Sequence, residues 1–509
     1  MAIIECISAI ILYLCGLKHK SKPMNSKLIL TLLLICVCLP AAAAKVKRPG
    51  SRTYIYRYWL RDKQGSNYSL DRPLRFLSAK SIERRQRQGL IVDSTDLPVS
   101  RKYVALFRHK LTQVIGTSRW QNTVLVSSTD SLLLEQLSGL PVVRRSQCVF
   151  VAPDSLEKTE DIRWTVHEDF NRWDSVKNDP LGMARPQIEM LGGDRLHQAG
   201  YRGQGMTIAI LDGGFQNYDR IPALQHARIT GLRDMVPDVL TTALSTGHGQ
   251  PKTPAMKIDH GTKVLSALAA HAPEVTMGTA PEATFMLLRC EMPEVEQAVE
   301  EDLWTMAAEV ADSAGADLIN SSLGYYDYDD HRGSYRLQDL DGQTAFISRT
   351  AAMLARKGIV HCNSAGNSGM GQWKKIGVPA DARDILTVGA ITQERRLAAF
   401  SSVGPSQDGR VKPDVVAMGA PATLISGRGT LVRDMGTSFS TPIVCGLVAC
   451  LWQAHPDKTA MDIIDMVRRS ADQYTEPTNV CGYGIPDFWK AHNDAQAPDS
   501  REDNAIIED

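Results

Sequence analysis

Apolar runs separated by helix-like segments dominate the chain from residue 187 onward. Continuous apolar stretches such as "MTIAILDGG", "ADLINSSLG", "GIVHCNSAGN" and "ILTVGAIT" have the length of single strands. Segments such as "TKVLSALAAH" and "EVEQAVEEDLWTMAAEVADSAG" lie between them and are helix-like. Strands that are apolar throughout and alternate with helices predict an α/β fold, a mostly parallel sheet covered by helices on both faces. Residues 187–490 are therefore expected to form one α/β domain, followed by an acidic tail at 491–509.

Residues 45–152 follow a different pattern. Short strand-like runs ("TYIYRYWL", "NTVLVSS", "CVFVAP") are mixed with helical stretches ("LSAKSIERRQRQG", "DSLLLEQLSG"). This mixture predicts a small α+β unit ahead of the α/β domain. The segment 153–186 is polar, charged and without periodicity, so it is predicted to be a linker.

The first 44 residues are predicted to be a signal peptide region. From Met24, which is the more natural start, a short basic segment precedes an apolar run at 28–39 and an alanine-rich stretch. The alternative is a transmembrane anchor, but about 12 apolar residues are too few to span a bilayer. A lipid anchor at Cys36 or Cys38 is a weaker alternative. We expect an exported protein, secreted, periplasmic or at the cell surface, with no stable membrane span after signal removal.

Charge and cysteine content narrow the classes of partner. The chain has 57 Lys and Arg residues against 57 Asp and Glu residues, so no overall field favours nucleic acid. The basic run "SIERRQRQG" is accordingly expected to be a solvated helix face. The cysteines beyond the signal region show no metal-like spacing. Cys445 and Cys450, on one predicted helix, are expected to be small buried core residues.

Four polar residues stand at the ends of predicted strands or the starts of predicted helices. Asp212 ends the strand "IAILD", His260 begins an alanine-rich helix, Asn367 lies in the turn "NSAGN", and Ser438 lies in "GTSFSTP". In parallel α/β sheets, chemistry gathers at the carboxyl ends of the strands. The bland interpretation of Ser438 is a helix cap, with the following proline in the first helical turn.

Together these four residues supply the parts that acyl transfer requires. Ser438 would attack a carbonyl carbon, and His260 would take its proton and pass it to the leaving amine. Asp212 would hold the imidazole in the right tautomer. Asn367 and the backbone N–H of Ser438 would stabilise the oxyanion.

The ordered motifs "AILDGG", "DHGT", "INSSLG", "NSAGN", "GRVKPDVVAMG" and "GTSFSTP" resemble those of the subtilisin-like serine proteases, the subtilases. The order Asp, His, Ser is that of subtilisin. The resemblance covers roughly residues 187–490 and implies a serine endopeptidase of subtilisin-like fold. It also implies two substrate-binding segments, one pairing with the substrate backbone and one forming the opposite wall of the specificity pocket: Ser322, Leu323 and Gly324, and Ser364, Ala365 and Gly366. Ordinary strand-end packing is the alternative for all six.

The sequence departs from the family pattern at four positions. Gly213 follows the aspartate where Ser or Thr is usual, and Lys263 stands where many subtilases have a second histidine. Met418 replaces a proline, and Ser368 stands where an acidic residue is frequent. None of these changes removes a catalytic group, so we expect activity.

Residues 45–152 resemble the family's prodomain, which assists folding and then covers the active site. Cleavage is then expected in the linker. The implied partners are protein or peptide substrates and the chain's own prodomain. No cofactor is expected for catalysis.

The resemblance leaves a structural calcium ion open, although the sequence offers no ligand set. The acidic run containing Asp327, Asp329 and Asp330 would bind a cation, select basic substrates or, the favoured interpretation, simply be solvated.

Two other functions are compatible with the scaffold. One is a catalytically silent binding protein, which would require the loss of a triad residue, and none is lost. The other is a non-peptidase acyl hydrolase, since a triad also cleaves esters. Against the second, Ser438 does not lie in a G-x-S-x-G elbow.

Overall fold

The computed structural model describes residues 46–47, 52–153, 155–156, 175–244 and 258–496. The predicted signal region and most of the predicted linker lie outside these residues. The acidic tail is predicted to begin at residue 491, which is too early by six residues because the last helix ends at Gln496. Helix α14 (Phe488–Gln496) continues through 491–496, because Ala491 and His492 are buried against the domain.

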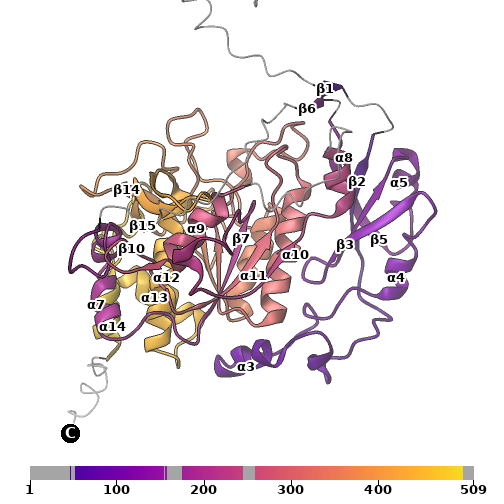
Figure 1. Ribbon diagram of the computed structural model, residues 1–509. Helices are drawn as coiled ribbons and strands as arrows, with labels where there is room; N and C mark the ends of the chain where they lie inside the picture. Colours follow the sequence, from indigo (N-terminus) through magenta and orange to yellow (C-terminus); the bar gives the residue numbers. More distant parts are fainter. Residues whose placement is uncertain (1–45, 48–51, 154, 157–174, 245–257, 497–509) are drawn as a thin grey trace, which may run out of the picture.

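A seven-stranded parallel sheet forms the centre of the larger domain (Figure 1). Its order is β15-β14-β13-β12-β7-β11-β8, and every neighbouring pair is parallel. The chain leaves β7 in one direction through β8 and β11 and in the other through β12 to β15. Ligands of such sheets bind at the carboxyl edge where the order reverses, which here lies between β7 and β12. The strand bounds are β7 (Thr207–Asp212), β8 (Arg228–Asp234), β11 (Thr284–Arg289), β12 (Leu318–Ser321), β13 (Val360–Ser364), β14 (Leu386–Thr392) and β15 (Val415–Ala420).

Helices cover both faces of this sheet, which confirms the predicted α/β fold. One core contains α9 (His260–Ala269), α12 (Thr437–Ala454) and α13 (Ala460–Ser470). The other contains α10 (Val299–Ala314) and α11 (Phe346–Arg356). Side chains of β7 alternate between the two, since Ile208 and Ile210 belong to the first core and Ala209 and Leu211 to the second.

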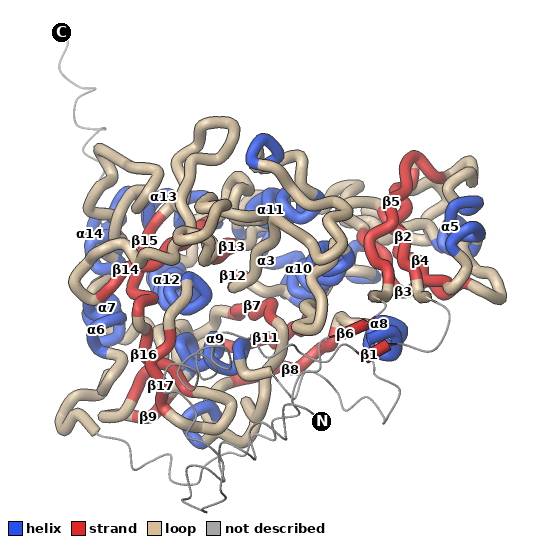
Figure 2. The backbone as a smooth tube through the Cα atoms, turned by 90° about the horizontal axis from the view of Figure 1, so that it is seen from above, coloured by secondary structure: helices blue, strands red, loops and turns tan. Residues whose placement is uncertain are grey.

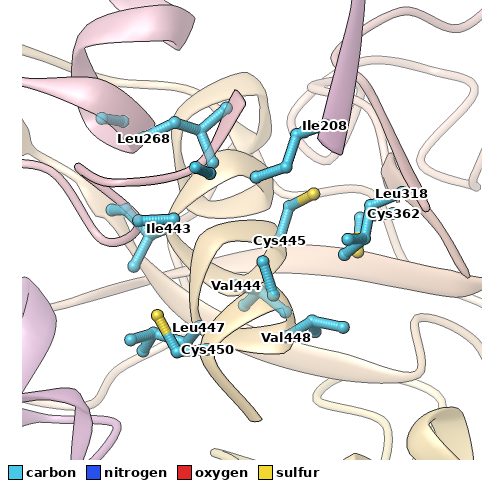
Figure 3. Close-up of a cluster of buried hydrophobic side chains, with 14 of the residues drawn as sticks. Ile208, Leu268, Leu318, Cys362, Ile443, Val444, Cys445, Leu447, Val448 and Cys450 are labelled. Atoms are coloured by element: carbon cyan, nitrogen blue, oxygen red, sulfur yellow. The ribbon is translucent and has the colours of Figure 1, made fainter. Parts of the chain in front are cut away.

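Helix α12 is the central helix of the first core. Figure 3 shows its Ile443, Val444 and Leu447 among side chains from the sheet and from α9. Cys445 and Cys450 are fully buried free cysteines, as predicted. The helix is long and apolar enough to cross a membrane, but 83% of its length is buried inside the protein. Its apolar character therefore serves the core of the domain.

Residues 52–153 form an α+β unit whose sheet lies at one side of the larger domain (Figure 2), whereas its helix α3 (Ala79–Arg87) lies against the larger domain (Figure 1). Its antiparallel sheet has the order β3-β4-β2-β5. Tyr58, Val124 and Leu134 form a small core between this sheet and its helices. The bounds are β2 (Tyr54–Leu60), β3 (Thr112–Ser118), β4 (Thr123–Ser128), β5 (Val143–Val151), α3 (Ala79–Arg87), α4 (Arg101–Ala105) and α5 (Ser131–Leu137).

Smaller elements complete the fold. They are β1 (Val46–Lys47), β6 (Ser155–Leu156), α6 (Arg185–Glu189), α7 (Gly193–Gln198), α8 (Asp238–Leu244), β9 (His271–Ala272), β10 (Thr276–Met277), β16 (Ala422–Ile425) and β17 (Leu431–Asp434), with short 3-10 helices at Pro73–Arg75, Pro222–Leu224 and Leu337–Asp339.

Buried ion pairs join the N-terminal unit to helix α10. Asp312, which is fully buried, pairs with Arg84 and Arg85 of α3 and with Arg119 beyond β3. Arg84 also donates to the carbonyl oxygens of Ala316 and Lys357. The basic run is therefore not the solvated helix face that its composition predicts. Two of its arginines are buried because Asp312 and these carbonyls receive them.

A second group of contacts lies along the same helix. Arg57 of β2 pairs with Asp302, and both side chains are buried. Glu309 accepts the backbone N–H groups of Arg119 and Trp120, each at 3.0 Å. Removing one partner of such a buried pair would leave an uncompensated charge and destabilise the folded protein. The N-terminal unit is thus an integral part of the described structure.

Candidate active site

Asp212 and His260 meet at the carboxyl edge of the sheet. Asp212 is the last residue of β7 and is fully buried, and its Oδ1 accepts the N–H of Gly213 at 2.7 Å. His260 is the first residue of α9. Its Nδ1 lies 2.9 Å from Oδ1 and 3.0 Å from Oδ2 of Asp212. This contact holds the Nδ1–H tautomer and leaves Nε2 free to accept a proton.

The environment of His260 favours its charged form. Burial lowers the pKa of His260, but the charge of Asp212 and the hydrogen bond to it raise the pKa to about 9. The carboxyl group of Glu291 adds to this increase. A strongly perturbed histidine bound to a buried carboxylate at a strand end is typical of a catalytic site.

Ser438 is the second residue of α12 and is buried. At this position its backbone N–H belongs to the first helical turn. The N–H groups of that turn have no helical partner and form the positive end of the helix dipole. The predicted place of the proline is wrong: Pro442 lies in the second turn. Because proline has no N–H, the carbonyl of Ser438 loses its helical partner four residues on.

Ser322 replaces that missing partner. Its hydroxyl donates to the carbonyl oxygen of Ser438 at 2.8 Å, and the hydroxyl of Ser438 donates to the carbonyl oxygen of Ser322 at 3.3 Å. The two residues therefore tie the start of α12 to the end of β12. The ring of His260 lies 5.7 Å from that of Phe439, the residue after Ser438.

Asn367 lies in the loop after β13, beside the start of α12. Its side-chain oxygen accepts the backbone N–H of Thr437 at 2.9 Å and the Thr437 hydroxyl at 3.0 Å. These two donors fix the amide so that Nδ2 is the free donor. The structure thus brings Asn367 to the residue that precedes Ser438.

The six predicted substrate-binding residues lie in two loops that follow neighbouring strands. Ser322 to Gly324 follow β12, and Ser364 to Gly366 end and follow β13. Ser364 donates weakly to the carbonyl oxygen of Leu323 at 3.5 Å. Gly366 has a φ of 102°, a conformation that favours glycine, and its N–H donates to Thr437 at 3.2 Å. Leu323 and Ala365 are buried, whereas Gly324 is exposed. Both segments therefore lie next to Ser438, and their substrate role stays a prediction.

Glu291 was missed by the sequence analysis. Its Oε2 lies 2.9 Å from the position that a Cβ on Gly213 would occupy. The glycine at 213, where the family usually has Ser or Thr, is the signal in the sequence that could have identified Glu291, because a missing side chain leaves space for a neighbour.

At another position where the sequence departs from the family pattern, Lys263 pairs with Asp434 at 3.0 Å and with Asp259 at 3.5 Å. That pair ties α9 to the segment before Ser438.

The acidic run after β12 is held by local contacts. Asp327 binds His331 and Ser334, each at 2.9 Å. Asp329 accepts the N–H of Glu296 at 2.9 Å. Within the described ranges, no three His, Cys, Asp or Glu side chains are grouped so as to hold a metal ion. A structural calcium ion stays a prediction.

Two family models and several known proteases match this chain. A model of the subtilase family matches residues 203–484, and a model of the Bacteroidota peptidase S8 propeptide domain matches residues 56–164. The serine protease AprX of Bacillus subtilis (strain 168) is 25% identical over 312 residues, 55% of this chain and 65% of that protein. The subtilisin-like protease SBT6.1 of Arabidopsis thaliana is 28% identical over 284 residues, 54% of this chain and 24% of that protein. The chain thus spans less than two thirds of the length of either relative.

A solved structure extends the comparison to the fold. The crystal structure of the epidermin leader peptide processing serine protease EpiP from Staphylococcus aureus superposes with a TM-score of 0.57 at 16% identity. The superposition covers 88% of this chain and 100% of that one. It shows that the two chains share a fold.

Proposed function

Because the chain belongs to the subtilase family, we propose that it is a serine endopeptidase whose triad is Asp212, His260 and Ser438. The observation that carries the proposal is the contact between His260 and Asp212 at the carboxyl edge of the sheet, with Ser438 in the first turn of α12. Its substrates are proteins or peptides. The retention of all three groups in the sequence favours an enzyme over a silent binding protein.

The proposed reaction begins when the hydroxyl of Ser438 turns from Ser322 toward Nε2 of His260. His260 takes the proton while the serine oxygen attacks the carbonyl carbon of the peptide bond. The imidazolium that forms is stabilised by Asp212 and then gives its proton to the leaving amine. Water, activated by the same imidazole, hydrolyses the acyl-enzyme and restores Ser438.

The oxyanion of the tetrahedral intermediate is assigned two donors. One is the backbone N–H of Ser438 in the first turn of α12, and the other is Nδ2 of Asn367. The bonds from Thr437 to Asn367 Oδ1 support this role, since they orient the amide before any substrate binds. Preorganised donors of this kind are among the largest contributions to acyl transfer.

The N-terminal unit is proposed to act as a prodomain in an exported precursor. The propeptide match at 56–164 and the buried contacts with α10 support this role. Cleavage is placed in the linker 153–186, because its sequence is polar and without periodicity, as is typical of segments that proteases cut. Folding must precede the cut, because the triad exists only once the sheet has assembled.

A matched set of proteins tests the proposal. Wild-type protein, Ser438→Ala and the control Ser440→Ala are produced in an exporting host, assayed on casein and sequenced from the N-terminus. Wild type and the control should hydrolyse casein and begin within the linker. Ser438→Ala should be inactive and retain the N-terminal unit. Hydrolysis of casein by purified Ser438→Ala at the wild-type rate would contradict the proposal.

A further inference from the structure

Glu291 lies beside the triad, in a place where a side chain at position 213 would otherwise lie. Strand β11 ends at Arg289, which pairs in register with Asp212 on β7. Glu291 follows two residues later, and its Oε2 lies 2.9 Å from the Cβ position of Gly213. The carboxyl group therefore lies over the backbone that follows the triad aspartate. The glutamate at 291 can occupy this place because the glycine at 213 has no side chain.

The surroundings of Glu291 are predominantly acidic. Asp212 lies on one side, Glu296 lies in the segment that leads into α10, and Glu300 lies in the first turn of α10. The nearby cation Arg289 is already paired with Asp234, at 2.9 and 3.0 Å. Burial and then the charge of Asp212 raise the pKa of Glu291 to about 8, while the charge of His260 opposes this. Among the described residues, none donates a hydrogen bond to the Glu291 carboxyl group.

A buried hydroxyl group lies close enough to two of these carboxyl groups to be affected by their charges. Tyr325 is 1% exposed, and its phenol oxygen has no hydrogen-bond partner among the described residues. Burial raises the pKa of Tyr325, and the charges of Glu300 and Glu291 raise it further. Buried polar groups normally have partners. Glu300 accepts the N–H groups of Met292 and Gln297, whereas the carboxyl group of Glu291 has no such donor among the described residues. An unpartnered phenol oxygen near an unpaired carboxyl group is complementary to a ligand that carries only donors and a positive charge.

The position of Glu291 relative to the predicted specificity pocket identifies the part of the substrate involved. That pocket lies beyond β12 and β13, whereas Glu291 lies beyond β11, on the other side of β7. Successive side chains of an extended peptide point to opposite sides. When one side chain enters the pocket, the side chain of the preceding residue points toward β7 and β11.

We propose that Glu291 binds a lysine or arginine side chain of the substrate, at the residue that precedes the one held in the specificity pocket. This inference rests on the proposed endopeptidase function and names a substrate preference for the same site. The carboxyl group of Glu291 accepts hydrogen bonds from the basic side chain. Asp212 remains engaged with His260, so the two carboxyl groups have separate tasks.

Three peptides that differ at this single residue test the preference. The peptides carry arginine, glutamine or glutamate at the position immediately before the residue whose carbonyl group is attacked. For each peptide, kcat/KM is measured with the processed wild-type protein, Glu291→Gln and Glu294→Gln. Glu294 is an exposed glutamate of the same segment and serves as the control. Wild type and the control should prefer arginine to glutamine by about tenfold to a hundredfold, the range of a hydrogen bond to a charged group. Glu291→Gln should cleave the arginine and glutamine peptides at equal rates.

A second variant displaces the carboxyl group of Glu291 without removing it. Gly213→Ser places a Cβ against Oε2 of Glu291, and the flexible carboxyl group must move away. This variant should also lose the arginine preference and still cleave the glutamine peptide. If Glu291→Gln and Gly213→Ser keep the full arginine preference, Glu291 is not the binding group. If wild type cleaves none of the three peptides, nor casein, the endopeptidase proposal itself fails.

Discussion

The hydroxyl of Ser322 donates to the carbonyl oxygen of Ser438, over 2.8 Å, in place of a helical N–H group. Pro442 creates this vacancy because it stands four residues after Ser438 and has no N–H to donate. The proposed nucleophile is thereby fixed to the end of β12, the segment predicted to pair with the substrate. One proline thus couples the position of Ser438 to that of the substrate strand.

The first prediction concerns this coupling. Ser322→Ala should lower the free energy of unfolding by about 1–3 kcal/mol, because a buried carbonyl group is left without a partner. It should also lower kcat, since the backbone of Ser438 loses its attachment. Ser440→Ala is the control, because the carbonyl oxygen that Ser440 contacts also accepts the Thr441 hydroxyl at 2.7 Å. Urea denaturation and steady-state kinetics measure both effects, and equal behaviour of the two variants would contradict the coupling.

The second prediction concerns the oxyanion. Asn367→Ala should lower kcat by about a hundredfold to a thousandfold, the usual loss for one such donor. KM should change little, because the bond forms mainly in the transition state. Ser368→Ala in the same loop is expected to retain wild-type kcat. A kcat for Asn367→Ala equal to that of wild type would remove Asn367 from the mechanism.

The third prediction concerns pH. His260 acts as a base only when it is neutral, so kcat/KM should rise as pH rises through its pKa. An unperturbed imidazole titrates near 6.5, but the local charges raise the pKa of His260 to about 9. Activity should therefore continue to increase above pH 7. A rate profile from pH 5 to 10 measures this, and a flat profile would count against the role of His260.

The fourth prediction concerns the buried arginines of α3. In a Ser438→Ala background, which keeps the N-terminal unit attached, Arg84→Ala should lower the free energy of unfolding by about 3–5 kcal/mol. The reason is that Asp312 and two carbonyl groups lose a buried partner. Arg87→Ala on the same helix should cost at most about 1 kcal/mol, because Arg87 is 48% exposed. Similar unfolding midpoints for the two variants would show that the buried pair does not hold the unit.

The parallel sheet and the order of the site residues were predictable from the sequence. Fully apolar strands such as β7 and β12 give a strong pattern, and polar residues at their ends stand out against it. The same reasoning places Asp212 and Ser322 at one edge without any knowledge of distances. Secondary structure and strand ends are local properties of the chain.

The burial of Arg84 and Arg85 was not predictable in this way. Arg85 also pairs with the nearby Asp96, but the partner that both arginines share, Asp312, is more than 200 residues away in sequence. A basic helix looks solvated until such a partner is known. Glu291 escaped notice for the same reason, since its closeness to Gly213 depends on the pairing of β11 with β7. Long-range pairing of charges sets these contacts, and periodicity carries no information about it.

The most direct test of the proposed triad is labelling of the processed protein with a fluorophosphonate, followed by mapping of the modified peptide. The reagent reacts with a serine activated by a neighbouring base, and the account predicts a single label on Ser438. His260→Ala should abolish rapid labelling, because the serine then has no base. A label on another residue, or equally rapid labelling of His260→Ala, would contradict the assignment of Ser438 as the nucleophile.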